Sequence, residues 1–150
     1  MKTLLSVFLF FSFLTSNAQS AEEKINHLLD NWHQAAAVAD ETAFYDSMTP
    51  DARYLGTDEN EDWERDQMRK WSKEYFDQGT TWNFKKKNRN IYLYSDGKLA
   101  WFDETLDTWM GVCRGSGVVI LTPQGWKIKH YVLSVAVPND KIDAYLEIIK

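Results

Sequence analysis

The sequence predicts a single α+β domain, with helices in its first half and antiparallel strands in its second half. From Glu22 to Phe76, most apolar residues recur at intervals of three and four, which is the helical period. From Thr81 onward, short apolar runs alternate with turn residues, which is typical of strands. No internal repeat, low-complexity tract or linker divides the chain. This order favours helices packed on one face of an antiparallel sheet.

The first half contains three predicted helices and one short strand. The spacing of Ile25, Leu29 and Trp32 places apolar side chains on one stripe of the first helix. Asp40 is suited to cap the second helix, and Pro50 ends it, because proline and the residue before it resist helical geometry. The predicted elements are a helix from Glu22 to Val38, a helix from Glu41 to Met48, a strand from Ala52 to Thr57 and a helix around Trp63–Phe76.

The second half is predicted to form a run of strands and a terminal helix. Gly97 follows Ser95 and Asp96 in a clear turn, and Pro138 opens the final helix. The predicted strands are Thr81–Lys87, Asn90–Tyr94, Leu99–Thr108, Val112–Leu121 and Trp126–Ala136.

The turn between the last two strands fixes an expected register. Pro123 and Gly125 fit a three-residue hairpin loop that pairs Thr122 with Trp126. Val118 then lies opposite His130, and Arg114 opposite Ser134. Because Lys127 and Lys129 fall on the other face, the even-numbered residues are predicted to face inward. Arg114 and His130 would line one cavity, about 13 Å apart at ~3.4 Å per residue.

The N-terminal segment has the pattern of a secretory signal peptide. Lys2 precedes an apolar run from Leu4 to Leu14, and Ser16-Asn17-Ala18 supplies small residues for cleavage. The run is too short for a transmembrane helix. We therefore expect residues 1–18 to be a signal peptide and residues 19–150 the mature domain. The product would be exported, either periplasmic or secreted, with no membrane attachment after cleavage.

Composition excludes several kinds of partner. A formal charge of −5 disfavours nucleic-acid binding, and the run Lys85–Lys87 is interpreted as a solvated edge of the sheet. Cys113 is the single cysteine, and the three histidines are scattered, so no metal site is expected. Phosphate-binding glycine motifs and nucleophile elbows are absent, and we expect no cofactor.

Two fragments of the last strands resemble a known family. Arg114-Gly115-Ser116-Gly117 is similar to its Arg-Gly-Thr strand, and Trp126-Lys127-Ile128-Lys129-His130, followed by Ser134 and Pro138, to its closing strand. The family is the SnoaL-like, ketosteroid-isomerase-like branch of the nuclear transport factor 2-like superfamily. The likeness spans roughly residues 22–138. It implies an α+β cone, in which N-terminal helices pack on a curved antiparallel sheet that encloses a pocket.

The resemblance also implies a homodimer formed through the outer face of the sheet. The parity argument assigns the odd-numbered residues of the last two strands to that face. They are Val119, Leu121, Tyr131, Leu133 and Val135.

Three functions remain open at this point, because this superfamily includes enzymes, binding domains and oligomerisation modules. The first is an exported small-molecule-binding protein that holds a polar or acidic ligand through Arg114, since arginine grips carboxylates bidentately. The second is a cofactor-independent isomerase or lyase, with Asp103 or Glu104 as base and His130 as a further acid–base group. The third is a dimerising module without a functional pocket. The expected ligand-binding residues are Arg114, Tyr54, Trp32, Trp101 and Ser134.

Overall fold

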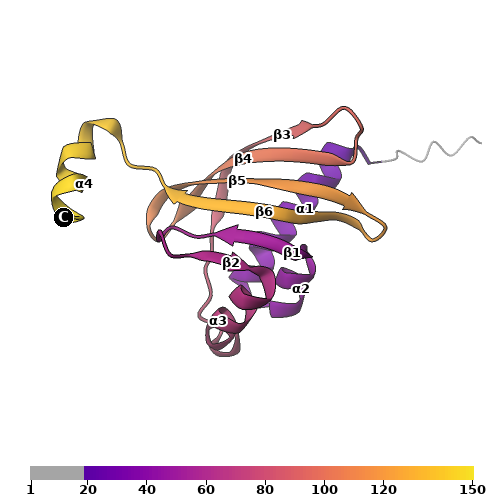
Figure 1. Ribbon diagram of the computed structural model, residues 1–150, viewed down its shortest axis with the longest axis horizontal. Coiled ribbons are helices and arrows are strands. Elements are labelled where there is room, and N and C mark those ends of the chain that lie inside the picture. The colour runs from indigo at the N-terminus through magenta and orange to yellow at the C-terminus, as the bar shows by residue number, and fades with distance from the viewer. Residues whose placement is uncertain (1–18) are drawn as a thin grey trace, which may run out of the picture.

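The computed structural model describes residues 19–150 and shows helices packed against one curved sheet (Figure 1). The predicted signal peptide, residues 1–18, lies outside the described residues. The helices are α1 (Ala21–Ala37), α2 (Glu41–Asp46), α3 (Arg65–Gln78), a 3₁₀ turn η1 (Asn139–Lys141) and α4 (Ile142–Ile148). The strands are β1 (Met48–Leu55), β2 (Asp62–Glu64), β3 (Lys85–Leu93), β4 (Leu99–Thr108), β5 (Gly111–Thr122) and β6 (Gly125–Val135).

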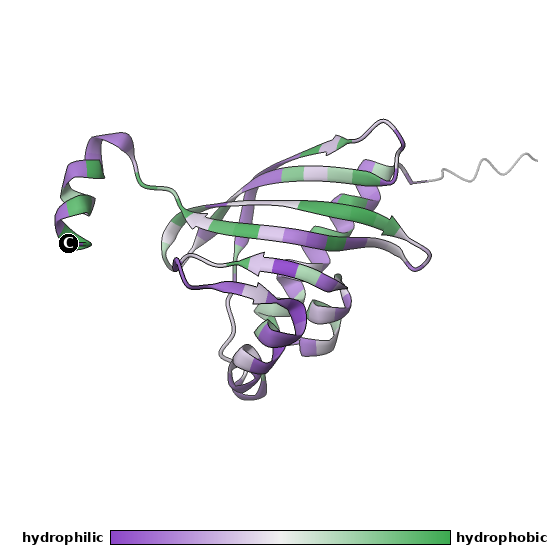
Figure 2. Cartoon of the chain, viewed as in Figure 1, coloured by the Kyte–Doolittle hydropathy of each residue, from purple (hydrophilic) through white to green (hydrophobic). Residues whose placement is uncertain are grey.

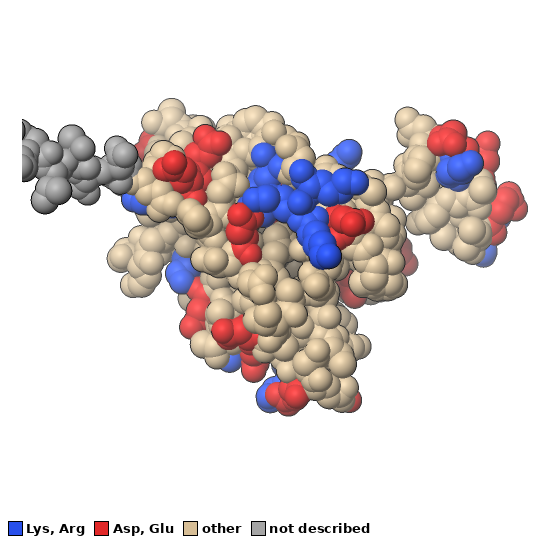
Figure 3. All heavy atoms as spheres, turned by 180° about the vertical axis from the view of Figure 1, so that it is seen from behind, with Lys and Arg blue, Asp and Glu red and all other residues tan. Residues whose placement is uncertain are grey.

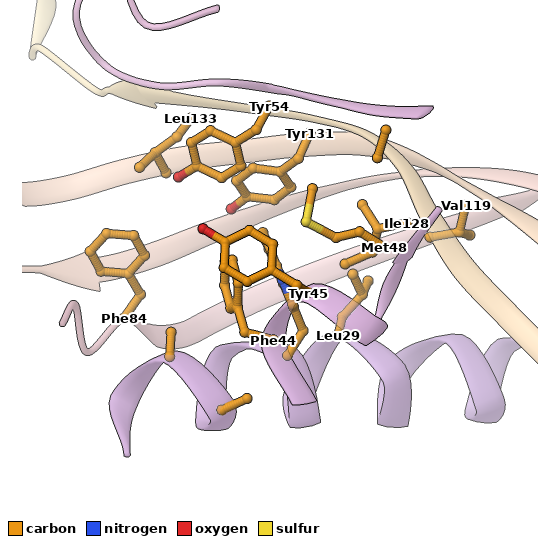
Figure 4. Close-up of a cluster of buried hydrophobic side chains, with 14 of the residues drawn as sticks. Leu29, Phe44, Tyr45, Met48, Tyr54, Phe84, Val119, Ile128, Tyr131 and Leu133 are labelled. Carbon is orange, nitrogen blue, oxygen red and sulfur yellow. The ribbon is translucent and has the colours of Figure 1, made fainter. Parts of the chain in front are cut away.

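The six strands form one sheet in the order β2-β1-β6-β5-β4-β3. The β1–β6 pair is parallel and the other pairs are antiparallel. Helices α1, α2 and α3 supply buried side chains to the same core as the inner face of the sheet. The close-up of this core shows Leu29 of α1 and Phe44 and Tyr45 of α2 facing the strands (Figure 4). The predicted α+β cone with N-terminal helices is therefore confirmed.

Local signals in the sequence account for where the first helices begin. Ser20 accepts a hydrogen bond from the Glu23 amide at 3.1 Å, and the Glu23 carboxylate accepts one from the Ser20 amide at 2.7 Å. This reciprocal pair satisfies two amides that the first helical turn leaves free. Asp40 accepts from the Ala43 amide at 2.9 Å, which confirms it as the cap of α2.

Strand β3 differs from the sequence prediction. A single strand covers Lys85–Leu93, where two shorter strands were expected, and a shift in its pairing with β4 falls between Lys86 and Asn88. β3 is an edge strand, and its three lysines are exposed, as expected for charges that protect an edge. Viewed from behind, lysine and arginine side chains gather beside carboxylates (Figure 3), and Lys86 contacts Asp30 of α1 at 2.8 Å.

A β-bulge in β6 decides which side chains face the core. The hairpin loop has two residues, so Thr122 pairs with Gly125 rather than with Trp126. Between the pairs Val119–Ile128 and Val118–His130, β6 carries one extra residue. The predicted pairing of Val118 with His130 is confirmed, as is that of Arg114 with Ser134.

The bulge overturns the predicted inner face. Before it, Trp126 and Ile128 are buried; after it, Tyr131 and Leu133 are buried instead. On β5 the odd-numbered residues are buried throughout Cys113–Val119, so the even-numbered side chains face outward. Three residues expected on the outer face, Val119, Tyr131 and Leu133, are therefore wrongly assigned and belong to the core, whereas Leu121 and Val135 are exposed as expected. The bulge explains Tyr131 and Leu133, and the shorter loop explains Val119, because it places Val119 opposite the buried Ile128.

The C-terminal helix stands apart from the body of the domain (Figure 1). Hydrophobic and hydrophilic residues are interspersed along α4 (Figure 2), and four apolar residues with helical spacing in and just after it are exposed. They are Ile142, Tyr145, Leu146 and Ile149. Within residues 19–150, no helix combines the length and the apolar character needed to cross a bilayer.

Candidate functional site

A buried carboxylate lies at the centre of the inner sheet face. Glu104 of β4 has a fully buried side chain, and one of its oxygens, Oε1, has two partners. The His33 Nε2 atom of α1 lies 2.8 Å away, and the Tyr131 hydroxyl of β6 donates to the same oxygen at 3.0 Å. One helix and one neighbouring strand therefore contribute partners to the acid on β4.

Arg89 of β3 neutralises this carboxylate. Its Nε donates to Glu104 Oε2 at 2.9 Å, and its Nη2 lies 2.7 Å from the same oxygen. The third nitrogen, Nη1, donates to Asp30 at 2.7 Å. The Arg89 side chain is 1 % exposed. The arginine that pairs with this buried acid is therefore Arg89 of β3 and not Arg114.

These contacts decide the ionisation of Glu104. Burial raises its pKa, but the hydrogen bond and charge of His33, together with Arg89, outweigh burial and leave the pKa below its ordinary value. Burial also raises the pKa of Tyr131 well above its ordinary value. At neutral pH Glu104 is therefore an ionised acceptor and Tyr131 a neutral donor. With both oxygens committed, Glu104 is poorly suited to remove a proton from a substrate.

The glycines of the Arg114–Gly117 fragment make room for this network. A Cβ atom at Gly115 would lie 2.2 Å from the Tyr131 hydroxyl and 3.0 Å from Glu104 Cγ. A Cβ at Gly117 would lie 2.9 Å from the Phe102 ring. Such distances exclude a side chain without rearrangement. The fragment that carries the family resemblance therefore serves inner packing, and its arginine points the other way.

A separate pocket opens between α3, the β1–β2 loop and the β4–β5 turn. Its volume is about 140 Å³, and six of its twelve lining residues are aromatic. Trp63 and Trp71 stack with their ring centres 5.4 Å apart, and Trp109 on the β4–β5 turn is 82 % exposed. The aromatic lining residues are Tyr54, Trp63, Trp71, Trp82, Phe84 and Trp109.

Tyr54 supplies a polar group at the inner end of this pocket. Its ring stacks on Tyr131 at 5.4 Å, and its hydroxyl lies on the side of Leu133 and Phe84, which also line the pocket (Figure 4). The Tyr131 hydroxyl donates a hydrogen bond to Glu104, whereas the Tyr54 hydroxyl has no hydrogen-bond partner among residues 19–150. Burial, and then the nearby charge of Glu61, raise the pKa of Tyr54, so the phenol remains protonated and can donate.

The structure divides the predicted site residues between the two faces of the sheet. Tyr54 lines the pocket, and Glu104 is the inward acid of the Asp103–Glu104 pair. Trp32 faces the core, where it stacks on Phe44 at 5.0 Å, and it does not line the pocket.

The remaining predicted residues occupy the outer face, so the predicted shared cavity of Arg114 and His130 is wrong. Asp103 accepts a hydrogen bond from the Asn90 side chain at 2.9 Å, and Trp101 is exposed and stacks on Tyr92 of β3. The physical reason is parity: the bulge in β6 reverses the side-chain alternation on which the inward assignment depended. The outward residues are Trp101, Asp103, Arg114, His130 and Ser134.

Sequence reasoning missed three residues of the buried network and the pocket: His33, Arg89 and Glu61. His33 follows Leu29 by four and precedes Ala36 by three, so its helical spacing already marked the buried stripe. Arg89 lies between the two strands that were predicted separately, so no side-chain direction was predicted for it. The structure shows that both segments belong to the single strand β3. Glu61 lies in a loop, where no periodicity predicts the direction of its side chain.

No three histidine, cysteine, aspartate or glutamate side chains in the described part of the chain are arranged to hold a metal ion.

Known proteins show what the chain is similar to. The family model of the SnoaL-like domain matches residues 25–138. Among curated proteins, none matches the chain. A nuclear transport factor 2-like protein of unknown function from Pseudomonas putida KT2440 superposes with a TM-score of 0.66 and 15 % identity, covering 81 % of this chain and 90 % of its own.

Two further structures show the same architecture. A putative aromatic ring hydroxylase from Novosphingobium aromaticivorans has a TM-score of 0.65 and 19 % identity, over 81 % of this chain and 94 % of its own. A putative dehydratase of the nuclear transport factor 2-like family from Streptomyces avermitilis has a TM-score of 0.64 and 14 % identity, over 77 % and 96 %. At these identities the likeness concerns the fold alone. The family match extends over most of the chain, so the protein belongs to the SnoaL-like family, and it shares the fold of nuclear transport factor 2-like proteins.

Proposed function

We propose that this protein binds a small organic molecule in its aromatic pocket. The observation that carries the proposal is the unpartnered Tyr54 hydroxyl within a pocket whose walls are half aromatic. Ligand sites in proteins combine apolar walls with a few placed polar groups, which is the arrangement here. Tyr54 would orient the ligand by donating a hydrogen bond, and the rings would supply most of the binding energy.

The size of the pocket restricts the ligand. A cavity of roughly 150 Å³ can hold benzene, and this pocket has about 140 Å³. The site therefore suits a molecule of benzene size, or one group of a larger ligand that extends past the exposed rim at Trp109.

Binding is better supported than proton transfer. The enzyme hypothesis requires a carboxylate base with a free oxygen beside an open cavity. Both oxygens of Glu104 have partners, and Asp103 lies on the outer face. Arg114 also lies on that face, so it is not placed to anchor an acidic ligand in the pocket.

A pocket-filling substitution tests the proposal. Leu133→Phe places extra volume in the pocket, whereas Val132→Phe adds the same ring on the outer face of the same strand. Titration with benzyl alcohol, followed through the tryptophan indole N–H signals by NMR, should give saturable shifts in the unmodified protein and in Val132→Phe. Leu133→Phe should weaken binding at least fivefold while the circular dichroism spectrum is retained. Equal affinity in all three proteins would place the ligand elsewhere and refute the proposal.

We retain two further proposals about where and how the protein works. The N-terminal pattern supports export to the periplasm or beyond the cell.

Dimerisation through the outer sheet face is supported by exposed aromatic side chains on that face. Tyr92 and Trp101 stack with their ring centres 5.6 Å apart, and both are more than 40 % exposed.

A further inference from the structure

The charge of the aromatic pocket is one-sided. Glu61 contributes a carboxylate to its lining, and within residues 19–150 no lysine, arginine or histidine lines it. Glu61 forms no ion pair with any described residue. An acidic ligand would therefore meet a like charge and no cation, which is unfavourable in a partly desolvated site.

The Glu61 carboxylate is held at the pocket by its own loop. The Glu61 carbonyl accepts a hydrogen bond from the Gly56 amide at 2.8 Å, which closes the loop between β1 and β2. The side chain then folds back over Gly56, where a Cβ atom would lie 2.0 Å from Oε2. Oε2 also accepts a long hydrogen bond of 3.3 Å from the Asp58 amide. Oε1 has no partner among residues 19–150 and remains available to a ligand.

Aromatic rings beside a carboxylate are the combination that recognises organic cations. The faces of tryptophan and tyrosine attract a cation through the ring quadrupole, and alkylated ammonium groups are the ligands for which such cages are best known. Four tryptophans and Tyr54 line this pocket together with Glu61. We propose that the pocket ligand is an alkylated ammonium compound, whose cationic head contacts the rings and Glu61.

This proposal rests on the function proposed above and names its ligand class. The ligand proposed here is a cation, whereas a polar or acidic ligand held by Arg114 was expected from the sequence. The Tyr54 hydroxyl fits the same ligand, since it can donate to a polar group carried a few atoms from the ammonium head.

Choline and 3,3-dimethylbutan-1-ol test the proposal, because they differ in the replacement of a quaternary nitrogen by carbon. Isothermal titration or NMR should show that the unmodified protein binds choline at least tenfold more tightly than the neutral alcohol. Glu61→Gln should reduce this preference to less than threefold. The matched control is Glu59→Gln, which removes an exposed carboxylate from the same loop and should leave the preference unchanged.

A second variant tests the contribution of the rings. Trp109 is largely exposed, so Trp109→Leu should not affect folding. It should weaken choline binding about threefold and affect the neutral alcohol less.

The outcomes separate this inference from the proposed function. Binding of benzyl alcohol without a preference for choline would overturn the cation assignment and leave the pocket function intact. Failure of the unmodified protein to bind any of the three probes would overturn both. A preference for choline that survives in Glu61→Gln would show that the carboxylate has no part in recognition.

Discussion

Removal of the buried cation should destabilise the domain more than any other arginine substitution. Arg89→Met keeps a long side chain but leaves Glu104 ionised, with His33 and Tyr131 as its remaining partners. The Arg89 and Glu104 side chains are 1 % and 0 % exposed, so water cannot replace the lost charge. The perturbation therefore acts through desolvation of a carboxylate rather than through a surface ion pair.

The expected loss is about 3–5 kcal/mol of unfolding free energy, the range found when one partner of a buried pair is removed. A Coulomb estimate agrees: two charges ~4 Å apart at an effective dielectric constant of 20 interact by about 4 kcal/mol. The contact of Arg89 with Asp30 adds little, because the Asp30 side chain is 45 % exposed.

Urea unfolding at pH 7 measures this loss, with Arg53→Met as the control. Arg53 pairs with Asp62 and Glu64 but is 41 % exposed, so its replacement should cost less than about 1 kcal/mol. The double variant Arg89→Met/Glu104→Leu removes both charges and should be more stable than Arg89→Met alone. A loss below about 1 kcal/mol in Arg89→Met, or a double variant less stable than the single one, would refute the reasoning.

The pH dependence provides an independent check on the same pair. Because its native pKa is lowered, ionised Glu104 stabilises the fold fully above its unfolded pKa of about 4.3. This stability is lost as the pH falls through the lower native pKa. In Arg89→Met, burial without the cation should raise the pKa of Glu104, so that it becomes protonated at higher pH. The stability difference between the two proteins should therefore be smaller at pH 4 than at pH 7.

Two further predictions concern the inner and outer sheet faces. Tyr131→Phe keeps the stacked ring but removes the hydrogen bond to Glu104, and should cost about 1.5–3 kcal/mol in urea unfolding. A loss under 0.5 kcal/mol would mean that the hydroxyl contributes nothing to the network. Trp101→Lys on the outer face should shift sedimentation from dimer to monomer without changing binding in the pocket, because Trp101 is exposed on the face opposite the core. Unchanged sedimentation would argue against that face as the interface.

Much of the secondary structure could be predicted because its causes are local. The cap at Asp40, the alternating run from Leu99 to Thr108 and the Pro123–Gly125 turn each depend on neighbours in sequence. The pairing of Val118 with His130 was also correct, although the loop length was not. Two errors cancelled here, because the extra residue of the β6 bulge restored the register that the shorter loop had shifted.

The candidate site was less predictable, because side-chain direction depends on parity. A single inserted residue exchanges the faces of a strand, and nothing in the pattern of Lys127 and Lys129 revealed where the insertion lay. The inward prediction for Arg114 and His130 failed on this point. Glu104 was named as a candidate, but its partners His33 and Arg89 come from segments 71 and 15 residues away.

The sequence by itself determined the order of the helices and of most strands, the family likeness and the pair of candidate acids, Asp103 and Glu104, on β4. These properties follow from periodicity, capping and turn chemistry, which act over a few residues. Tertiary structure alone decided that Arg89 neutralises Glu104, that Arg114 faces outward and that Glu61 joins four tryptophans at one pocket. Such encounters depend on how distant segments pack, and a change of one residue in register is enough to replace one site with another.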